Sequence, residues 1–308
     1  MIYLKPLGGL CNRIRTVDSM LTLCKENKED LTILWVNNPA LNSNYDELFL
    51  IPEISGFKLT IVNCPPGFPD LYFPKAINSI KNIVKGRRLS AEYKPLLKKI
   101  VQAKAKNSIN NHYLMDLYEA PKYVDKLSAG ELDEMIYPKL ASDLKKFFNN
   151  NTTSGYIDSC HRLCPIENDY KLFVPAEDIQ KRIQNTVNRF NNTIGLHIRK
   201  SDHVTSRKYS TTEKFVSIVD KEIERDPKVS FFVSTDDEET KQHLISNYGD
   251  KIIYNEISSY DRNDPLAVKD AVVDLYCLAA TSKLFGSHHS SFSQVAAIIG
   301  GIEEITAR

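Results

Sequence analysis

The nine residues IGLHIRKSD, at positions 194–202, carry the clearest structural signal in the chain. Four of the first five are apolar or glycine, and such a run with β-branched residues is typical of a buried strand. The charged residues that follow mark the loop at the carboxyl end of that strand, the edge at which open α/β sheets bind ligands. Arginine at such an edge clamps a phosphate through two parallel hydrogen bonds. The stretch therefore predicts an α/β sheet with an anion-binding edge.

The rest of the carboxyl-terminal half repeats this alternation of strand and helix. Further apolar runs predict strands at 229–233, 251–254 and 283–285, and the run at 283–285 is expected to be the last strand. Helical patterns separate these runs. Strands separated in this way build a parallel, doubly wound sheet.

The amino-terminal half opens with a βαβ pattern, in which residues 2–4 and 31–36 are the predicted strands. The turn before the intervening helix holds a glycine pair at 8–9. Glycines there let backbone amides and the helix N-terminus approach a phosphate, although a tight turn made only for packing would also use them. Asn12 and Arg13, in the first helical turn, would add side-chain donors.

Length and composition limit the classes of protein that fit. A chain of 308 residues is expected to form two domains, which we place at residues 1–175 and 176–308. The net charge of +1 does not indicate nucleic-acid binding. Six scattered cysteines predict reduced thiols, and the CHRLC sequence at 160–164 lacks a second ligand pair at zinc-site spacing, so no metal site is predicted. With no signal-peptide pattern and no run of ~20 apolar residues, we expect a cytoplasmic location.

Residues 81–106 form a basic stretch opposed by little more than Glu92. A run of this kind is commonly a solvated helical surface. It would also attract an acidic acceptor or anionic lipid headgroups, so peripheral contact with a membrane is the second interpretation.

Three polar clusters follow strands of the carboxyl-terminal half, and a parallel sheet brings them to one edge. They are His197, Arg199 and Asp202 after the first strand, Asp236 and Asp237 after the second, and residues 287–293 after the last. Serine hydroxyls and the free amides of a following helix suit phosphate oxygens. An aspartate can accept both donors of a guanine edge, N1–H and the amino group, which uracil and adenine do not offer together.

Each cluster also has an ordinary structural interpretation. Asp236 could cap the helix that begins near Glu238, the serines before Phe292 could cap theirs, and His197 could be a satisfied core histidine. A metal site at 236–237 is disfavoured, because the chain contains no Asp-x-Asp sequence.

The clusters resemble three ordered motifs of the α-1,6-fucosyltransferases, including the nodulation enzymes, with the protein O-fucosyltransferases as relatives. The motifs read GLHIRKSD at 195–202, VSTDD at 233–237 and SSFSQVA at 290–296. The loop GGLCNR at 8–13 is similar to the glycine-rich amino-terminal loop of those enzymes. The resemblance covers the carboxyl-terminal half and, in the amino-terminal half, only that loop.

This resemblance implies a GT-B-like α/β fold of two Rossmann-like domains with the donor site in the cleft and the amino-terminal domain on the acceptor side. It also implies an inverting transfer of fucose from GDP-fucose to a glycan hydroxyl, without a metal or another cofactor. Arg199 would hold the β-phosphate and stabilise the departing GDP. The implied donor-binding residues are Gly9, Asn12, Arg13, His197, Lys200, Asp236, Asp237, Ser290, Ser291, Phe292 and Ser293.

The chain departs from the family pattern in two respects. The second arginine of the first motif is Lys200 here, and lysine keeps the charge but loses the bidentate fork. The acidic residue that the animal α-1,6 enzymes place after this motif is absent, so the catalytic base cannot be carried over. Asp202 is the first candidate for that base, followed by His203 and Glu213.

Two other functions stay open at this point. The first is a GT-B transferase that uses a different nucleotide sugar. The second is a non-catalytic nucleotide-sugar-binding protein, which Lys200 and the missing base would suit. An oxidoreductase is disfavoured, because neither glycine cluster gives Gly-x-Gly-x-x-Gly followed by an acidic residue.

Overall fold

The structure is a computed structural model that describes residues 1–68, 90–110, 114, 127, 129–150, 154–200, 204–261 and 263–308. The chain divides into two compact units. Unit 1 consists of Met1–Pro121 and Leu132–Asn168, and unit 2 of Lys122–Glu131 and Asp169–Arg308.

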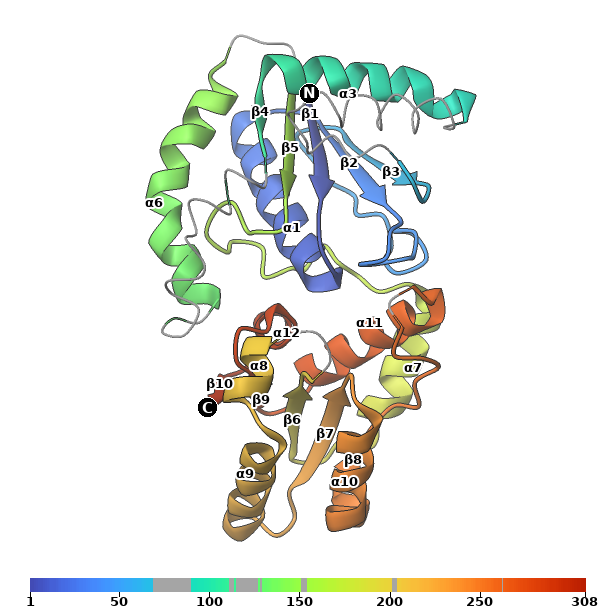
Figure 1. Ribbon diagram of the computed structural model, residues 1–308, viewed down its shortest axis with the longest axis vertical. Coiled ribbons are helices and arrows are strands. Elements are labelled where there is room, and N and C mark those ends of the chain that lie inside the picture. The colour runs from blue at the N-terminus through green and yellow to red at the C-terminus, as the bar shows by residue number, and fades with distance from the viewer. Residues whose placement is uncertain are drawn as a thin grey trace. The chain divides into compact units, whose positions relative to one another are not determined.

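Unit 1 contains a five-stranded sheet in the order β3-β2-β1-β5-β4, in which every neighbouring pair is parallel (Figure 1). Its elements are β1 (Ile2–Pro6), α1 (Leu10–Asn27), β2 (Leu31–Val36), β3 (Leu59–Cys64), the 3-10 helix η1 (Ala91–Tyr93), α3 (Lys94–Lys106), β4 (Ser108–Ile109), α6 (Ala129–Phe148, of which residues 129–131 belong to unit 2) and β5 (Gly155–Ser159). The predicted strand at 31–36 has the bounds of β2.

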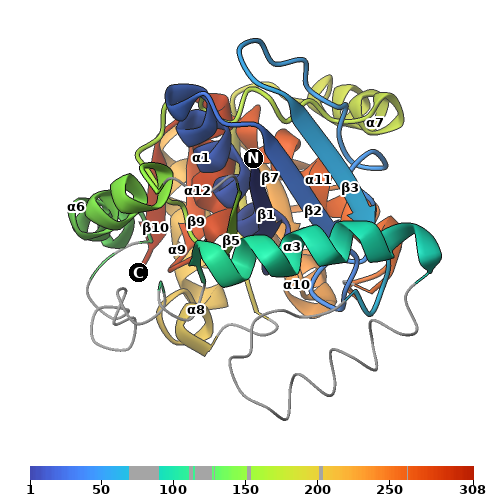
Figure 2. The same cartoon turned by 90° about the horizontal axis from the view of Figure 1, so that it is seen from above.

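Helices cover both faces of this sheet, which is why its central strands are apolar on both sides. α3 packs Ile100 and Ala103 against Tyr3, Leu34 and Tyr156, which share one face. α1 contacts β1 and β2 from the other face, and Figure 2 shows α1 and α3 on opposite sides of these strands.

Unit 2 contains a second five-stranded parallel sheet, in the order β10-β9-β6-β7-β8. Its elements are α7 (Glu177–Val187), β6 (Thr193–Ile198), α8 (Val204–Tyr209), α9 (Thr212–Arg225), β7 (Ser230–Thr235), α10 (Glu238–Tyr248), the 3-10 helix η2 (Gly249–Lys251), β8 (Ile252–Ile253), α11 (Pro265–Ala279), β9 (Leu284–Ser287), α12 (Ser291–Gly300) and β10 (Glu304–Ala307).

The two faces of the second sheet are covered by different helices. Ile194, Leu196 and Ile198 of β6 face α9 and α10, whose Phe215 and Leu244 belong to the same core cluster. α11 and α12 cover the opposite face. Glycine in β9 allows α12 to come close, because a β-carbon at residue 286 would lie 2.5 Å from the hydroxyl oxygen of a serine on α12. The position of α12 therefore depends on a strand residue without a side chain.

Two parallel sheets, each covered by helices, confirm the predicted α/β class. The prediction that residues 283–285 form the last strand is wrong, because β10 follows and adds to the edge of the sheet beside β9. β10 has the sequence EITA, and its Glu304 is half-buried, with its carboxyl hydrogen-bonded to Ser293. A short strand that begins with a charged residue is missed by a search for apolar runs.

All six cysteines are free thiols. No helix formed by the described residues combines the length and the apolar character that crossing a membrane requires.

Candidate functional site

The predicted site residues of unit 2 that the structure describes gather at the carboxyl edge of its sheet. β6, β7 and β9 end side by side there, and His197 is in register with Ser234 on one side and Gly286 on the other. Residues in register on neighbouring strands point to the same face. His197 and Ser234 therefore lie on the face that α11 and α12 cover.

Ser287 ties two of these strand ends together. Its hydroxyl donates to the carbonyl oxygen of His197 at 3.1 Å and accepts from the backbone N–H of Arg199 at 2.9 Å. The side chain of Ser287 is buried. The backbone that carries Arg199 is thereby fixed to the end of β9.

His197 combines burial with an unused polar atom. It is 8% exposed, and its ring stacks on Phe292 of α12 with the centroids 4.9 Å apart. Its Nδ1 atom has no hydrogen-bond partner within the described part of the chain. Burial lowers the pKa of His197 below its usual range, the Asp236 carboxylate acts against this, and the Arg199 charge adds to it. The imidazole is therefore neutral at pH 7 and has a nitrogen available for a ligand.

The two aspartates after β7 have different contacts. Asp237 is the N-cap of α10 and accepts from the backbone N–H of Thr240 at 2.8 Å. Asp236 accepts from the backbone N–H of Lys200 at 2.6 Å. The capping alternative considered for Asp236 thus applies to Asp237, whereas Asp236 joins the end of β7 to the loop after β6.

The turn into α12 supplies the third cluster. Ser290 caps the helix and accepts from the backbone N–H of Phe292 at 3.3 Å, as the structural alternative expected. Ser293 is fully buried and donates to the carbonyl oxygen of Ser290 at 3.2 Å. Ser291 is half-buried, and the first turn of α12 has no acidic residue. The first turn therefore adds no negative charge of its own to the positive end of this helix dipole, which suits an anion.

Two histidines between β9 and α12 were not among the predicted site residues. His288 is buried, and its Nδ1 accepts from Nε of Arg308 at 3.1 Å. His289 adopts a left-handed backbone with a φ of 57°, a conformation in which histidine is enriched among non-glycine residues. Together they shape the turn that leads into Ser290.

Asp274 of α11 is a buried carboxyl that the sequence analysis missed. It accepts from Nδ2 of Asn255 at 2.7 Å and also from Ser234, the register partner of His197. Thr186 of α7 in turn donates to Asn255 at 2.6 Å. Burial raises the pKa of Asp274 to about 6. The available signal was a pair of aspartates, Asp270 and Asp274, spaced four residues apart in a largely apolar helix.

Of the three candidates for the catalytic base, the structure describes only Glu213. Asp202 and His203 lie outside the described residues, as does Ser201. Glu213 is exposed at the start of α9, and a hydrogen bond from Thr211 lowers the pKa of its carboxyl. It is therefore ionised at neutral pH, and Lys200 is close enough to contribute to this lowering.

Unit 1 has its own candidate anion site, at the glycine pair before α1. Gly8 has a φ of 78°, which only glycine adopts easily, and Asn12 lies over it. Gly9 is the N-cap of α1, where no side chain caps the helix and no acidic residue stands in its first turn. The first amides of α1 are thus arranged as the prediction for residues 8–13 requires.

Arg13 is held inside unit 1. The residue is 0% exposed, and it donates to the carbonyl oxygens of Gly8 at 3.0 Å and Val36 at 2.8 Å, and to Oδ1 of Asn38 at 3.1 Å. Its guanidinium carbon lies 5.1 Å from the centroid of a Trp35 ring, and burial lowers the pKa of the group to about 10. Its contacts make Arg13 a positioning residue that fixes the glycine turn to the end of β2.

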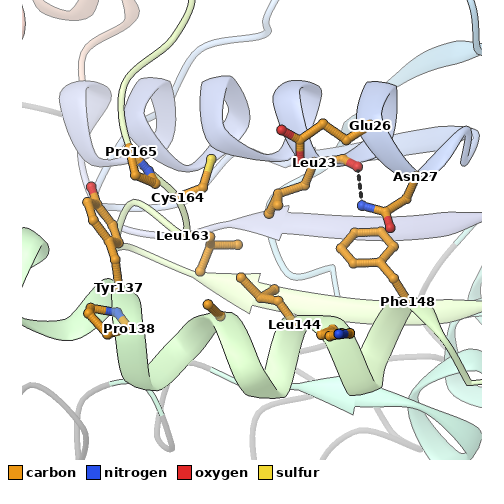
Figure 3. Close-up of a pocket in the computed structure, with 12 residues that line it drawn as sticks. Leu23, Glu26, Asn27, Tyr137, Pro138, Leu144, Phe148, Leu163, Cys164 and Pro165 are labelled. Atoms are coloured by element: carbon orange, nitrogen blue, oxygen red, sulfur yellow. Dashed lines mark hydrogen bonds between the residues drawn. The ribbon is translucent and has the colours of Figure 1, made fainter.

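A cavity of about 430 Å³ lies elsewhere in unit 1, between α1 and α6 (Figure 3). Leu23, Leu144 and Leu163 form its apolar wall, with the rings of Tyr137 and Phe148 beside them. None of the predicted site residues lines it.

The sequence matches no family model and none of the curated proteins. Solved structures of fucosyltransferases share its fold. A NodZ α-1,6-fucosyltransferase soaked with GDP-fucose is 14% identical, with 97% of this chain and 92% of that chain covered and a TM-score of 0.57. A variant of Arabidopsis thaliana FUT1 in complex with GDP is 15% identical, with 99% and 69% covered and a TM-score of 0.55. POFUT1 in complex with GDP-fucose is 12% identical, with 99% and 97% covered and a TM-score of 0.51.

These matches confirm the predicted resemblance at the level of the fold. The chain has the GT-B-like α/β fold of these enzymes, built from two Rossmann-like domains.

Proposed function

We propose that the protein is an inverting, metal-independent glycosyltransferase that moves fucose from GDP-fucose to a glycan hydroxyl. The observation that carries this proposal is the carboxyl edge of the second sheet. There, a neutral His197 with an unpartnered Nδ1 stacks on Phe292 beside Arg199 and the N-terminus of α12, in a fold shared with fucosyltransferases.

The chemistry is a single displacement at the anomeric carbon of fucose. The acceptor hydroxyl oxygen forms the new bond on the face opposite GDP, while the bond from carbon to the β-phosphate oxygen breaks and its electron pair goes to the phosphate. The acceptor's proton passes to a base. Negative charge grows on the pyrophosphate in the transition state, so donors aimed there contribute most of the catalysis.

Arg199 and the N-terminus of α12 are the groups we assign to the pyrophosphate. Ser287 fixes the Arg199 backbone, and the Ser290 cap sets where α12 begins. Ser291 lies in the first turn, next to the amides that can donate to phosphate oxygens. Lys200 would add charge without a bidentate geometry.

The guanine ring is assigned to the space beside His197. Asp274, buried and linked to Ser234, is a further carboxyl on this face that could accept from N1–H and the amino group of guanine. Asp236 and Asp237 stay candidates for contacts with the nucleoside. Asp237 would act there only in addition to capping α10.

The glycine turn of unit 1 is assigned a second anion-binding role through the amides that follow Gly9. Asn12 lies beside this turn, and Arg13 holds it in place. Asp202 stays the first candidate for the base, ahead of His203 and Glu213.

The test is thermal unfolding of the whole protein with GDP, GDP-fucose, UDP or ADP, each with and without a chelator. A ligand at 100 times its Kd raises the free energy of unfolding by about 2.7 kcal/mol, which shifts the melting temperature measurably. We expect stabilisation by GDP and GDP-fucose alone, unaffected by the chelator. Stabilisation by UDP would instead favour a transferase with another nucleotide sugar.

Lysine at position 200, where the family pattern has arginine, favours a second candidate function, that of a binding protein without activity. Such a protein would bind GDP-fucose and release no GDP from it during prolonged incubation. Slow hydrolysis of GDP-fucose without any acceptor, measured as free GDP, would therefore support the transferase and contradict the binding protein.

A further inference from the structure

α3 differs in its charges from the other charged helices. Its sequence KPLLKKIVQAKAK contains five lysines and no acidic residue. Every other described α-helix of ten or more residues that has a lysine or arginine also has an aspartate or glutamate. The whole chain has a net charge of only +1, so the five positive charges of α3 are a local excess and not part of a generally basic chain.

Four of the five lysines point to solvent. Lys94, Lys98, Lys99 and Lys106 are exposed, and no ion pair joins them to any other described residue. At 100° per residue they fall within an arc of roughly 140°, opposite the buried Ile100 and Ala103. The fifth, Lys104, lies with its ammonium 5.3 Å from the centroid of the Tyr156 ring. The exposed face of α3 is thus a strip of four unpaired cations on a helix roughly 20 Å long.

We infer that this lysine face, defined as Lys94, Lys98, Lys99 and Lys106, holds the protein at the surface of an anionic lipid bilayer. The apolar side of α3 is already packed on the sheet, so the contact is electrostatic adsorption rather than insertion of the helix. Each lysine near an anionic leaflet is attracted independently of exact geometry, which suits flexible side chains.

A bilayer fits this face better than a nucleic acid. α3 contains no arginine, the residue that reads phosphates and bases through paired hydrogen bonds, and it exposes no aromatic ring on which a base could stack. Val101, by contrast, is 47% exposed beside the lysines, and an apolar side chain is tolerated at the boundary between headgroups and acyl chains.

The experiment is co-sedimentation of the full protein with vesicles of phosphatidylcholine alone or with 30% phosphatidylserine, at low salt and at roughly 0.5 M NaCl. We expect binding only to the phosphatidylserine vesicles and only at low salt, where charges attract over about 10 Å. Changing Lys94, Lys98, Lys99 and Lys106 to Gln should lower the partition coefficient on the order of 1,000-fold.

A matched variant controls for the loss of net charge. Lys139, Lys181, Lys221 and Lys228 are exposed outside α3, and changing these four to Gln removes the same total charge. This control should bind within about twofold of the unchanged protein, and both variants should keep its melting temperature. An equal loss in both variants, no binding of the unchanged protein, or equally tight binding of a DNA duplex would each overturn the proposal.

Discussion

Arg199 is the residue on which the proposed chemistry depends most. Its backbone is held by the buried hydroxyl of Ser287, so the origin of the side chain is fixed before any ligand arrives. A donor that is already in place stabilises developing charge without reorganising at the moment of reaction.

We expect Arg199→Ala to slow the hydrolysis of GDP-fucose at least ~100-fold, the effect of removing one donor from a developing anion. The measurement is the initial rate of GDP release at saturating GDP-fucose. Arg225→Ala is the control, because Arg225 is an exposed arginine at the end of α9 and should leave the rate unchanged. A rate for Arg199→Ala near that of the unchanged protein would contradict the assignment.

Ionisation of the buried Asp274 carboxyl lowers the free energy of unfolding. Its pKa is about 6 in the folded chain against 3.8 as a reference, so between these values the folded state binds a proton that the unfolded state has lost. The contribution of Asp274 to stability therefore falls as the pH rises from about 4 to 6, and it stays low above that.

Asp274→Asn should accordingly raise the free energy of unfolding at pH 7.5 by up to about 3 kcal/mol, with little gain at pH 4. Urea unfolding at a series of pH values measures this difference. Asp250→Asn removes a carboxyl at an exposed position and is the control for the loss of one negative charge. An equal effect of Asp274→Asn at pH 4 and pH 7.5 would show that ionisation is not the cause.

At the level of elements, the contact between α11 and α12 depends on Gly300, the glycine at the end of α12. A β-carbon at Gly300 would overlap the backbone carbonyl oxygen of Ala279, which cannot move aside without shifting α11. The two helices form the layer above His197, so this close approach also sets the position of Phe292.

Gly300→Ala should therefore lower the free energy of unfolding by about 1–3 kcal/mol. Gly130→Ala is the matched variant. Gly130 lies in α6, and a β-carbon there would meet only the flexible amide end of Gln294, at 2.8 Å. That change should be neutral or slightly stabilising, since alanine favours helix. If urea unfolding shows the same loss of free energy of unfolding for both variants, the rigid backbone beside Gly300 is not the reason that this position requires glycine.

Elements with a regular apolar pattern could be predicted from the sequence, and those without one could not. β6 and β2 are apolar runs and appear where expected, and the buried residues of α9 follow helical spacing. β5 has the sequence GYIDS and β4 has two residues, so neither shows a period of its own. β5 is a strand because it pairs with β1, a partner far away in the chain, and β4 because it pairs with β5.

The same limit applies to the site. The described residues of the three motifs lie at one sheet edge, as predicted, because topology alone brings strand ends together. Whether Asp236 or Asp237 caps α10 depends on the residue at which the helix begins, a difference of one position. Asp274 lies at the edge only because α11 packs there. Such details are decided by tertiary contacts.

For the whole molecule, the two units have separate sheets and separate cores, so we expect them to unfold independently. The single tryptophan, Trp35, is buried in β2 and reports on unit 1 alone, whereas circular dichroism reports on both units. GDP should raise the midpoint of the dichroism transition of unit 2 more than the fluorescence midpoint of unit 1, because unit 1 contributes only its glycine turn to the proposed site. Coincident transitions that GDP shifts together would show one cooperative unit instead.

The pairing of β1 with β5 has a consequence during synthesis on the ribosome. Ile2 is made well before Gly155, its partner on one side. At roughly 5–20 residues per second, the ~150 residues between them take on the order of 8–30 seconds to appear. During this time one edge of β1 has no strand to pair with, and the nascent amino-terminal half is exposed to misassembly and to chaperones. β1, which precedes the other strands of its sheet in the chain, is thus among the last of them to be fully paired.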